Sequence, residues 1–137
     1  MTKHFFSIMS HPLSSDQIPA LFSELGAQEG WELRDEDILA KRWANIDPTV
    51  DLDTSLLEDI KGWLKSGERH EPAQAGDVVI VAGEPVHSLA LVNWCLAEGL
   101  VPVAATTRRE SVEKTQPDGS VVKTNIFRHV RYRKYVG

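Results

Sequence analysis

The fold is decided by residues 77–105, which read DVVIVAGEPVHSLALVNWCLAEGLVPVAA. The opening run, residues 77–83, is rich in β-branched side chains, which is typical of a central parallel strand covered on both faces. Residues 85–98 begin with proline and are apolar nearly all round, so we expect a buried helix. Residues 100–105 predict a second strand, and Pro102 suggests that it is irregular or lies near a sheet edge. Strand, helix and strand at this spacing predict a right-handed βαβ unit with parallel strands.

The N-terminal part of the chain extends this pattern. Residues 4–9 form an apolar run that predicts a buried strand. A helix is then expected from the capping box of Ser14 and Gln17 as far as Gly26, and residues 28–33 predict a short strand. The expected apolar face of this helix consists of Ile18, Leu21, Phe22 and Leu25.

Two more helices are predicted before residue 77. Acidic residues 35–37 open the first of them, which suits the helix dipole. Asp53 and Thr54 open the second, in which Trp63 falls on the apolar face, so we interpret it as a core residue rather than a stacking platform. Residues 66–76 are polar and contain glycine and proline, which predicts a mobile surface loop.

The C-terminal part of the chain has the pattern of an antiparallel hairpin. Its turn signal is Gln116-Pro117-Asp118-Gly119, flanked by two strand-like stretches. In the second stretch, simple alternation predicts that His129, Arg131 and Arg133 share one face.

Length and composition fit one globular domain. The chain has 137 residues, of which 42% are hydrophobic and 26% charged, which is enough for one core. The predicted fold class is therefore α/β: one Rossmann-like domain over residues 1–137, with a mainly parallel sheet flanked by helices and a hairpin over residues 107–135 appended.

The net charge of −5 is unevenly distributed along the chain. Residues 1–60 carry four basic and twelve acidic side chains, whereas residues 106–137 carry eight basic and three acidic ones. A locally basic end can create an anion site on an otherwise acidic protein, although the same charges could simply be solvated.

Several other classes of protein are not expected. No run of about 18 apolar residues is present to span a membrane, and the N-terminus lacks the features of a signal peptide. Cys95 is a single cysteine, which we interpret as a buried small hydrophobe in a cytoplasmic protein. No cluster has the spacing of a metal site, and no glycine-rich phosphate loop is present, so neither a metal nor a cofactor is predicted.

Polar residues directly follow the predicted strands, where open parallel sheets bind ligands. Ser10 and His11 follow the first strand, and Thr106-Thr107-Arg108-Arg109 follow the strand that ends at residue 105. Hydroxyls, an imidazole and two guanidiniums are the groups that a phosphodiester needs. Alternatively, the threonine side chains form hydrogen bonds with the backbone of a turn, and the arginine side chains are simply exposed to solvent.

Two further segments could bind anions. Gly83 ends the central strand and opens a helix, where backbone amides could face a ligand, although Glu84 disfavours phosphate there. Residues 128–135 interleave basic and aromatic side chains, which is also the pattern of a nucleic-acid-binding patch. Neither paired carboxylates nor a group of metal ligands is evident near these segments, so any cleavage would be metal-independent.

Three segments together resemble a known family. They are residues 9–17 (MSHPLSSDQ), 105–110 (ATTRRE) and 127–135 (FRHVRYRKY). Their order over nearly the whole chain resembles a small CRISPR-associated family of type III CRISPR systems, the ring nucleases with a CARF-like Rossmann fold. Residues 81–87 depart from the pattern of that family, which has glutamine before the glycine.

The resemblance implies a homodimer with one cyclic oligoadenylate, in particular cyclic tetra-adenylate, across its two-fold axis. It implies that a ribose 2′-hydroxyl attacks the adjacent phosphate without a metal, which would end the CRISPR signal. Alternatives are a sensor or sponge that does not cleave, and a nucleic-acid-binding accessory protein. The residues expected to be catalytic are His11, Thr107, Arg108 and Arg109, with proton transfer by His11. Those expected to bind ligand are Ser10, Gly83, Thr106, His129 and Arg131.

Overall fold

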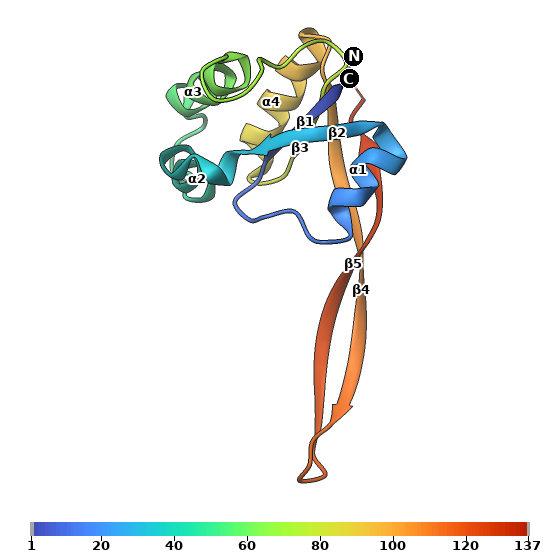
Figure 1. Ribbon diagram of the computed structural model, residues 1–137. Helices are drawn as coiled ribbons and strands as arrows, with labels where there is room; N and C mark the ends of the chain where they lie inside the picture. The colour runs from blue at the N-terminus through green and yellow to red at the C-terminus, as the bar shows by residue number, and fades with distance from the viewer. Residues whose placement is uncertain (1, 137) are drawn as a thin grey trace.

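The structure, a computed structural model, describes residues 2–136. Its centre is a five-stranded sheet with the strand order β2-β1-β3-β4-β5 (Figure 1). The strands are β1 (Lys3–Ile8), β2 (Ala27–Glu32), β3 (Val78–Val81), β4 (Val101–Thr115) and β5 (Val121–Lys134). The helices are α1 (Gln17–Leu25), α2 (Asp37–Ala44), α3 (Thr54–Lys65) and α4 (Pro85–Ala97), and a 3-10 turn, η1 (Leu33–Asp35), precedes α2.

The sheet is mostly parallel. β1 pairs with β2 on one side and with β3 on the other, and β3 pairs with β4, all in the parallel direction. β5 runs antiparallel to β4. The predicted strand–helix–strand unit is therefore present as β3, α4 and β4, and the predicted hairpin is β4 with β5. The register of β3 and β4 is unbroken at Pro102, so this proline does not make the strand irregular.

Helices cover both faces of the sheet, and each face has its own hydrophobic core. α2, α3 and α4 lie on one face and α1 on the other (Figure 1). The residues of β3 alternate between the two cores, because Val79 and Val81 belong to the first while Val78 and Ile80 belong to the second. Trp63 is only 9% exposed and packs in the first core, as its helical spacing predicts.

Two helices are less buried than their sequences predict. On α1, Ile18 and Phe22 are 50% and 59% exposed, and on α4, Val86 and Leu89 are 53% and 61% exposed. Each helix packs on the sheet through one stripe, and nothing within residues 2–136 covers the far side of either, so an apolar sequence alone does not bury it. Among the helices of residues 2–136, none is long and apolar enough to cross a membrane.

β4 continues far beyond the other parallel strands. It pairs with β3 as far as Val103, and from there to Thr115 its partner is β5. The two strands form a ribbon that projects from the body (Figure 1). Residues 106–109 were predicted to follow the strand, but they lie inside it. The prediction was wrong because a ribbon outside the body buries no continuous apolar face, and its strands therefore lack the usual hydrophobic pattern.

A β-bulge at Val130 breaks the alternation predicted for β5. Thr106 pairs with Arg131 and Thr107 pairs with His129, which leaves Val130 without an opposite residue. Opposed residues of two antiparallel strands share a face, whereas successive residues of one strand point to opposite faces. His129 and Arg131 therefore lie on opposite faces of the ribbon, and the prediction that they share one is wrong.

Candidate functional site

A cavity of about 380 Å3 lies where β1 and β3 end and β4 leaves the sheet. The loop after β1, the start of α1, the end of β3 and the ribbon form its walls. It is lined by Met9, His11, Pro12, Ser14, Gln17, Ala82, Ala105, Thr107 and Phe127. The carboxyl ends of adjacent parallel strands are where open α/β sheets bind ligands, and the volume is within the range of small-molecule sites. The cavity brings His11 and Thr107, predicted from separate segments, to one place.

His11 has a ring nitrogen that could take a proton. Its Nδ1 lies 3.2 Å from the carbonyl oxygen of Pro12. Since a carbonyl oxygen only accepts hydrogen bonds, Nδ1 donates in this contact, and the lone pair of the neutral ring is on Nε2. The side chain is exposed at the cavity, as a general base that meets a ligand must be. Its neighbour Ser10 is exposed and does not line the cavity.

The ribbon divides the predicted threonines and arginines between its two faces. Thr107 lines the cavity, and Arg109, two residues further along the same strand, points to the same face. Thr106 and Arg108 point to the opposite face, where Thr106 Oγ1 donates a hydrogen bond of 2.6 Å to the carbonyl oxygen of Arg131. Arg108 and Arg109, which were both expected to be catalytic, therefore point to opposite faces of the ribbon, because they are successive residues of one strand.

Gly83 has a packing reason to be glycine. A Cβ at this position would lie 2.6 Å from Nε1 of Trp43, and the same nitrogen donates a hydrogen bond of 2.9 Å to the carbonyl oxygen of Ala82. The indole thus occupies the space that any larger residue would need. The close approach of Trp43 explains this glycine without a ligand.

Glu84 occupies the N-terminus of α4. Its carboxylate accepts hydrogen bonds of 3.0 and 2.9 Å from the backbone N–H groups of Val86 and His87. These bonds, with a further one from the His87 ring, lower the pKa of Glu84 to about 2. Because a carboxylate already fills the anion position of this helix, the prediction of a ligand contact by the Gly83 loop has no support here.

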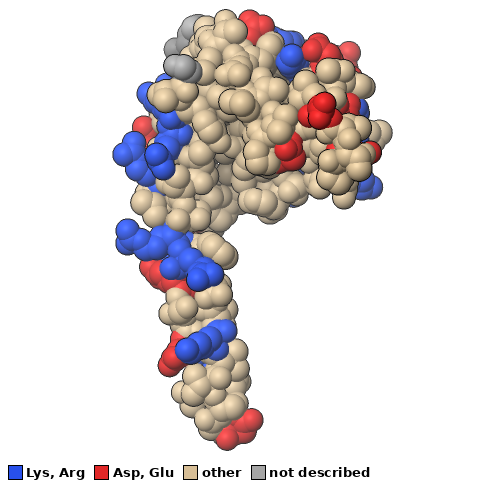
Figure 2. All heavy atoms as spheres, turned by 180° about the vertical axis from the view of Figure 1, so that it is seen from behind, with Lys and Arg blue, Asp and Glu red and all other residues tan. Residues whose placement is uncertain are grey.

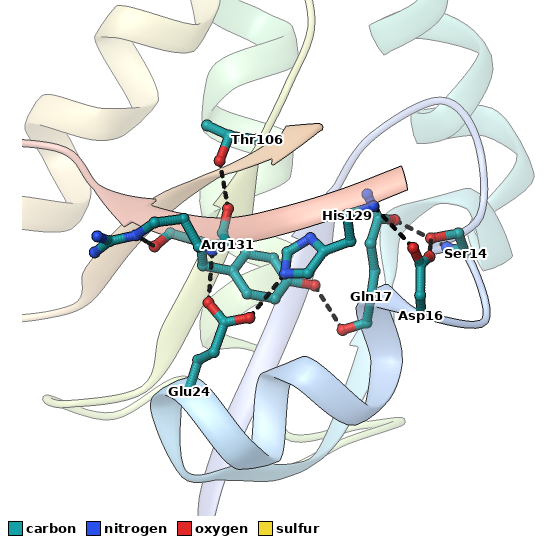
Figure 3. Close-up of polar contacts among 8 residues, drawn as sticks. Ser14, Asp16, Gln17, Glu24, Thr106, His129 and Arg131 are labelled. Atoms are coloured by element: carbon teal, nitrogen blue, oxygen red, sulfur yellow. Dashed lines mark hydrogen bonds and ion pairs between the residues drawn. The ribbon is translucent and has the colours of Figure 1, made fainter. Parts of the chain in front are cut away.

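His129 is held in the contact between the ribbon and α1 (Figure 3). Its Nε2 lies 2.8 Å from Oε2 of Glu24, and its ring packs against Tyr132 with centroids 4.7 Å apart. The side chain is 6% exposed, and its Nδ1 is buried without a hydrogen-bond partner among residues 2–136. His129 is not among the residues that line the cavity, so His11 is the better placed of the two predicted histidines.

Two carboxylates beside β5 bind its backbone (Figure 3). The N–H of Tyr132 donates to Oε1 of Glu24 and the N–H of His129 donates to Oδ2 of Asp16, each over 2.8 Å. Burial raises the pKa of Glu24, but the hydrogen bonds from Tyr132 and His129 outweigh it, so that the pKa lies below its ordinary value. Hydrogen bonds from Ser14 and from the His129 amide likewise lower the pKa of Asp16. Both groups are therefore ionised at neutral pH.

Four arginines lie on the ribbon face that points away from the cavity. Arg108 is directly opposite Arg128, while Arg131 and Arg133 face Thr106 and Ala104 on the next two same-face rungs. All four side chains are exposed, and Figure 2 shows Lys and Arg gathered where the ribbon leaves the body. We call this set the arginine face: Arg108, Arg128, Arg131 and Arg133. The sequence did not predict that Arg128 belongs to this face, because simple alternation would place it on the opposite face and only the bulge at Val130 reverses this.

Cys95 has no catalytic features. It is buried, and burial together with the nearby charge of Glu98 raises the pKa of its thiol to about 12. A thiol that remains protonated is a poor nucleophile, which confirms its interpretation as a small core residue. Within residues 2–136, no group of three His, Cys, Asp or Glu side chains is arranged to hold a metal ion.

The chain is similar in sequence to a described protein family over nearly its whole length. Residues 3–133 match the model of the family described as "Uncharacterized protein MJ1673 family". Protein MJ1673 of Methanocaldococcus jannaschii is 33% identical over 130 residues, which cover 95% of this chain and 95% of that protein. No solved structure matches the chain.

Proposed function

The chain belongs to the MJ1673 family, and from its own geometry we propose that it binds and cleaves a cyclic oligoadenylate, in particular cyclic tetra-adenylate. The observation that carries the proposal is the cavity at the carboxyl edge of the sheet, where His11 and Thr107 meet on the face to which Arg109 points. An imidazole, a hydroxyl and a guanidinium are suited to bind a phosphodiester and to move a proton. The motif resemblance to ring nucleases supports a ring of adenylates as that phosphodiester.

The position of the cavity supports a CARF-like, Rossmann-related fold as the finer assignment. In doubly wound sheets with the order 2-1-3-4-5, the ligand binds between the ends of strands 1 and 3, where the order changes direction. This chain has the same strand order, and residues that follow β1 and β3 line its cavity. The antiparallel β5 is the departure from an all-parallel doubly wound sheet.

In the proposed reaction the substrate supplies the attacking group. The 2′-oxygen of one ribose forms a bond to the adjacent phosphorus while the bond from phosphorus to the 5′-oxygen breaks. Nε2 of His11 accepts the 2′-hydroxyl proton, and the leaving 5′-oxygen takes a proton from water. The products are a linear oligoadenylate with a 2′,3′-cyclic phosphate at one end and a 5′-hydroxyl at the other. Arg109 and Thr107 bind the phosphate oxygens, whose negative charge increases in the transition state.

The size of the cavity supports a homodimer. About 380 Å3 is near the lower end for ligand sites and is too small for four nucleotides. A second copy related by a two-fold axis would supply an equivalent cavity for the other half of the ring. The proposed site is therefore shared between two subunits, and the protein would act in the cytoplasm, where the signalling ring is made.

The proposal is tested by incubating the purified protein with cyclic tri-, tetra- and hexa-adenylate in the presence of EDTA and separating the products by chromatography. We expect one ring to be opened to the linear cyclic-phosphate product. Arg109→Ala and His11→Ala should each slow cleavage by about tenfold or more, since each removes a group that acts on the reacting phosphate. Arg69→Ala is the matched control, because Arg69 is exposed, pairs with Glu36 and lines no part of the cavity.

The outcomes separate a nuclease from a binding protein. Cleavage that is lost in Arg109→Ala but retained in Arg69→Ala supports a metal-independent ring nuclease at this cavity. Binding of a ring without cleavage would make the protein a sensor or sponge that uses the same cavity. If no ring is bound or opened, the proposal is wrong.

A further inference from the structure

The arginine face is unusual because two of its members oppose each other. Arg108 and Arg128 form one cross-strand pair of the ribbon. Like charges directly opposite each other destabilise an antiparallel pair of strands. Within residues 2–136, Glu110 is the acidic residue that forms an ion pair with this face, 2.7 Å from Nε of Arg128, and the side chains of that pair are 60% and 43% exposed. Glu24 on α1 adds a weaker electrostatic attraction to Arg131. One solvated ion pair offsets little of the repulsion among four guanidiniums.

The arginines also have a regular spacing. Successive same-face rungs of a strand are two residues apart, which is about 6.6 Å along the ribbon. Arg128, Arg131 and Arg133 occupy three such rungs in succession, because the bulge at Val130 absorbs the extra residue between the first two. This spacing is comparable to the separation of successive phosphates in an extended nucleotide strand. The remaining positions of these rungs hold Thr106, Ala104 and Arg108.

We propose that the arginine face binds the phosphodiester backbone of an oligoribonucleotide, with one phosphate at each arginine rung. Guanidiniums bind phosphate oxygens with two parallel hydrogen bonds, and a bound phosphate offsets the repulsion between Arg108 and Arg128. The small side chains opposite Arg131 and Arg133 leave room for the strand. Because these rungs hold arginine, threonine and alanine, the face contacts the backbone of the strand rather than its bases, and its binding is independent of sequence.

Two sources could supply this phosphodiester chain: the proposed cyclic substrate or a linear single-stranded RNA. The inference rests on the proposed function only in the choice of the cyclic probe. A linear strand tests the arginine face even if the cavity does not cleave rings.

The experiment compares two charge-matched double variants. Arg128→Ala with Arg133→Ala removes two positive charges from the arginine face. Lys123→Ala with Lys134→Ala removes two from the opposite face, since Lys123 faces Glu113 and Lys134 faces Val103. All four side chains are exposed, so both variants should fold, which circular dichroism can verify. Fluorescence anisotropy measures binding of labelled linear octa-adenylate RNA over a range of salt concentrations, and unlabelled cyclic tetra-adenylate is the competitor.

We expect the arginine variant to bind linear RNA about five- to tenfold more weakly, and the lysine variant to bind it nearly as the unchanged protein does. The slope of log affinity against log salt should become less steep by about 1.4 in the arginine variant, since two phosphate contacts are lost. If cyclic tetra-adenylate displaces the labelled RNA, the backbone of the ring is also a ligand of this face. If it does not, the face binds linear strands. Equal binding by both variants, or the loss of self-association alone in the arginine variant, would overturn the proposal.

Discussion

The imidazole of His129 on β5 lies 2.8 Å from the carboxylate of Glu24 on α1, and this contact joins the ribbon to the body. Glu24 also accepts a hydrogen bond from the N–H of Tyr132. The two bonds go to different oxygens of the carboxylate, and glutamine has an NH2 group in place of one of them, so Glu24→Gln should lower the free energy of unfolding by about 1 kcal/mol at pH 7. Chemical denaturation measures this change, and Glu68→Gln is the control, because Glu68 is exposed and its side chain has no hydrogen-bond or ion-pair partner among residues 2–136.

The effect of Glu24→Gln should depend on pH. The folded-state pKa of Glu24 is lowered below its ordinary value of 4.5, so its contribution to stability is complete above pH 4.5. It is lost as the pH falls through the folded-state pKa. The difference between the two proteins should therefore shrink below pH 4.5. A difference that stays constant down to pH 3 would show that the carboxylate charge is not involved.

Gly83→Ala should destabilise the protein by about 2 kcal/mol, because the added Cβ would lie 2.6 Å from Nε1 of Trp43. The clash would also disturb the hydrogen bond from that nitrogen to Ala82. Adding Trp43→Phe to Gly83→Ala should cost less than the sum of the two single changes, since a smaller ring relieves the clash. Strictly additive free energies of unfolding would contradict the packing explanation of this glycine.

The thiol of Cys95 should be inert in the folded protein. It is buried, and its pKa is raised to about 12, so little thiolate is present at pH 8. Mass spectrometry after incubation with iodoacetamide should detect no labelling of the native protein and complete labelling in denaturant. Equal labelling rates in the two conditions would contradict the buried position.

Shortening the ribbon should leave the body stable. The side-chain ion pair and turn hydrogen bonds recorded for residues 112–124 join them to one another. Ser111 and Asn125 are directly paired, so replacement of residues 112–124 by Asn-Gly should close a two-residue turn between them. We expect the free energy of unfolding to change by less than about 0.5 kcal/mol. A much larger loss would show that the distal ribbon packs against the body or a second copy.

The sequence predicts best those elements whose hydrophobic pattern reflects burial in the sheet. Residues 77–83 are β-branched because β3 is covered on both faces, and its position between two parallel strands is confirmed. The hairpin was also predicted, but not that its first strand continues the strand that ends at residue 105, since a solvated ribbon imposes no continuous hydrophobic pattern. The bulge at Val130 was also undetectable, because it depends on how β5 pairs with β4.

For the candidate site, the sequence predicted which strand ends lie side by side but not the face on which each side chain lies. His11 and Thr107 meet because strand ends are adjacent in a parallel sheet, which is a general rule. The separation of Arg108 from Arg109 follows from their being inside a strand, and the burial of His129 follows from its contact with Glu24, more than 100 residues away in the chain. Such contacts leave no local signal in the sequence.

The carboxylates of Asp16 and Glu24 have a consequence for aggregation. β5 is the outer strand of the sheet, and outward N–H groups of such a strand are ready to recruit a strand of another molecule. At His129 and Tyr132 these groups are already bound to side chains of the same chain. An incoming strand would have to displace two ionised carboxylates to pair there. The protein can therefore keep a long ribbon on its surface while its root, next to the body, is closed to the strand addition that leads to fibrils.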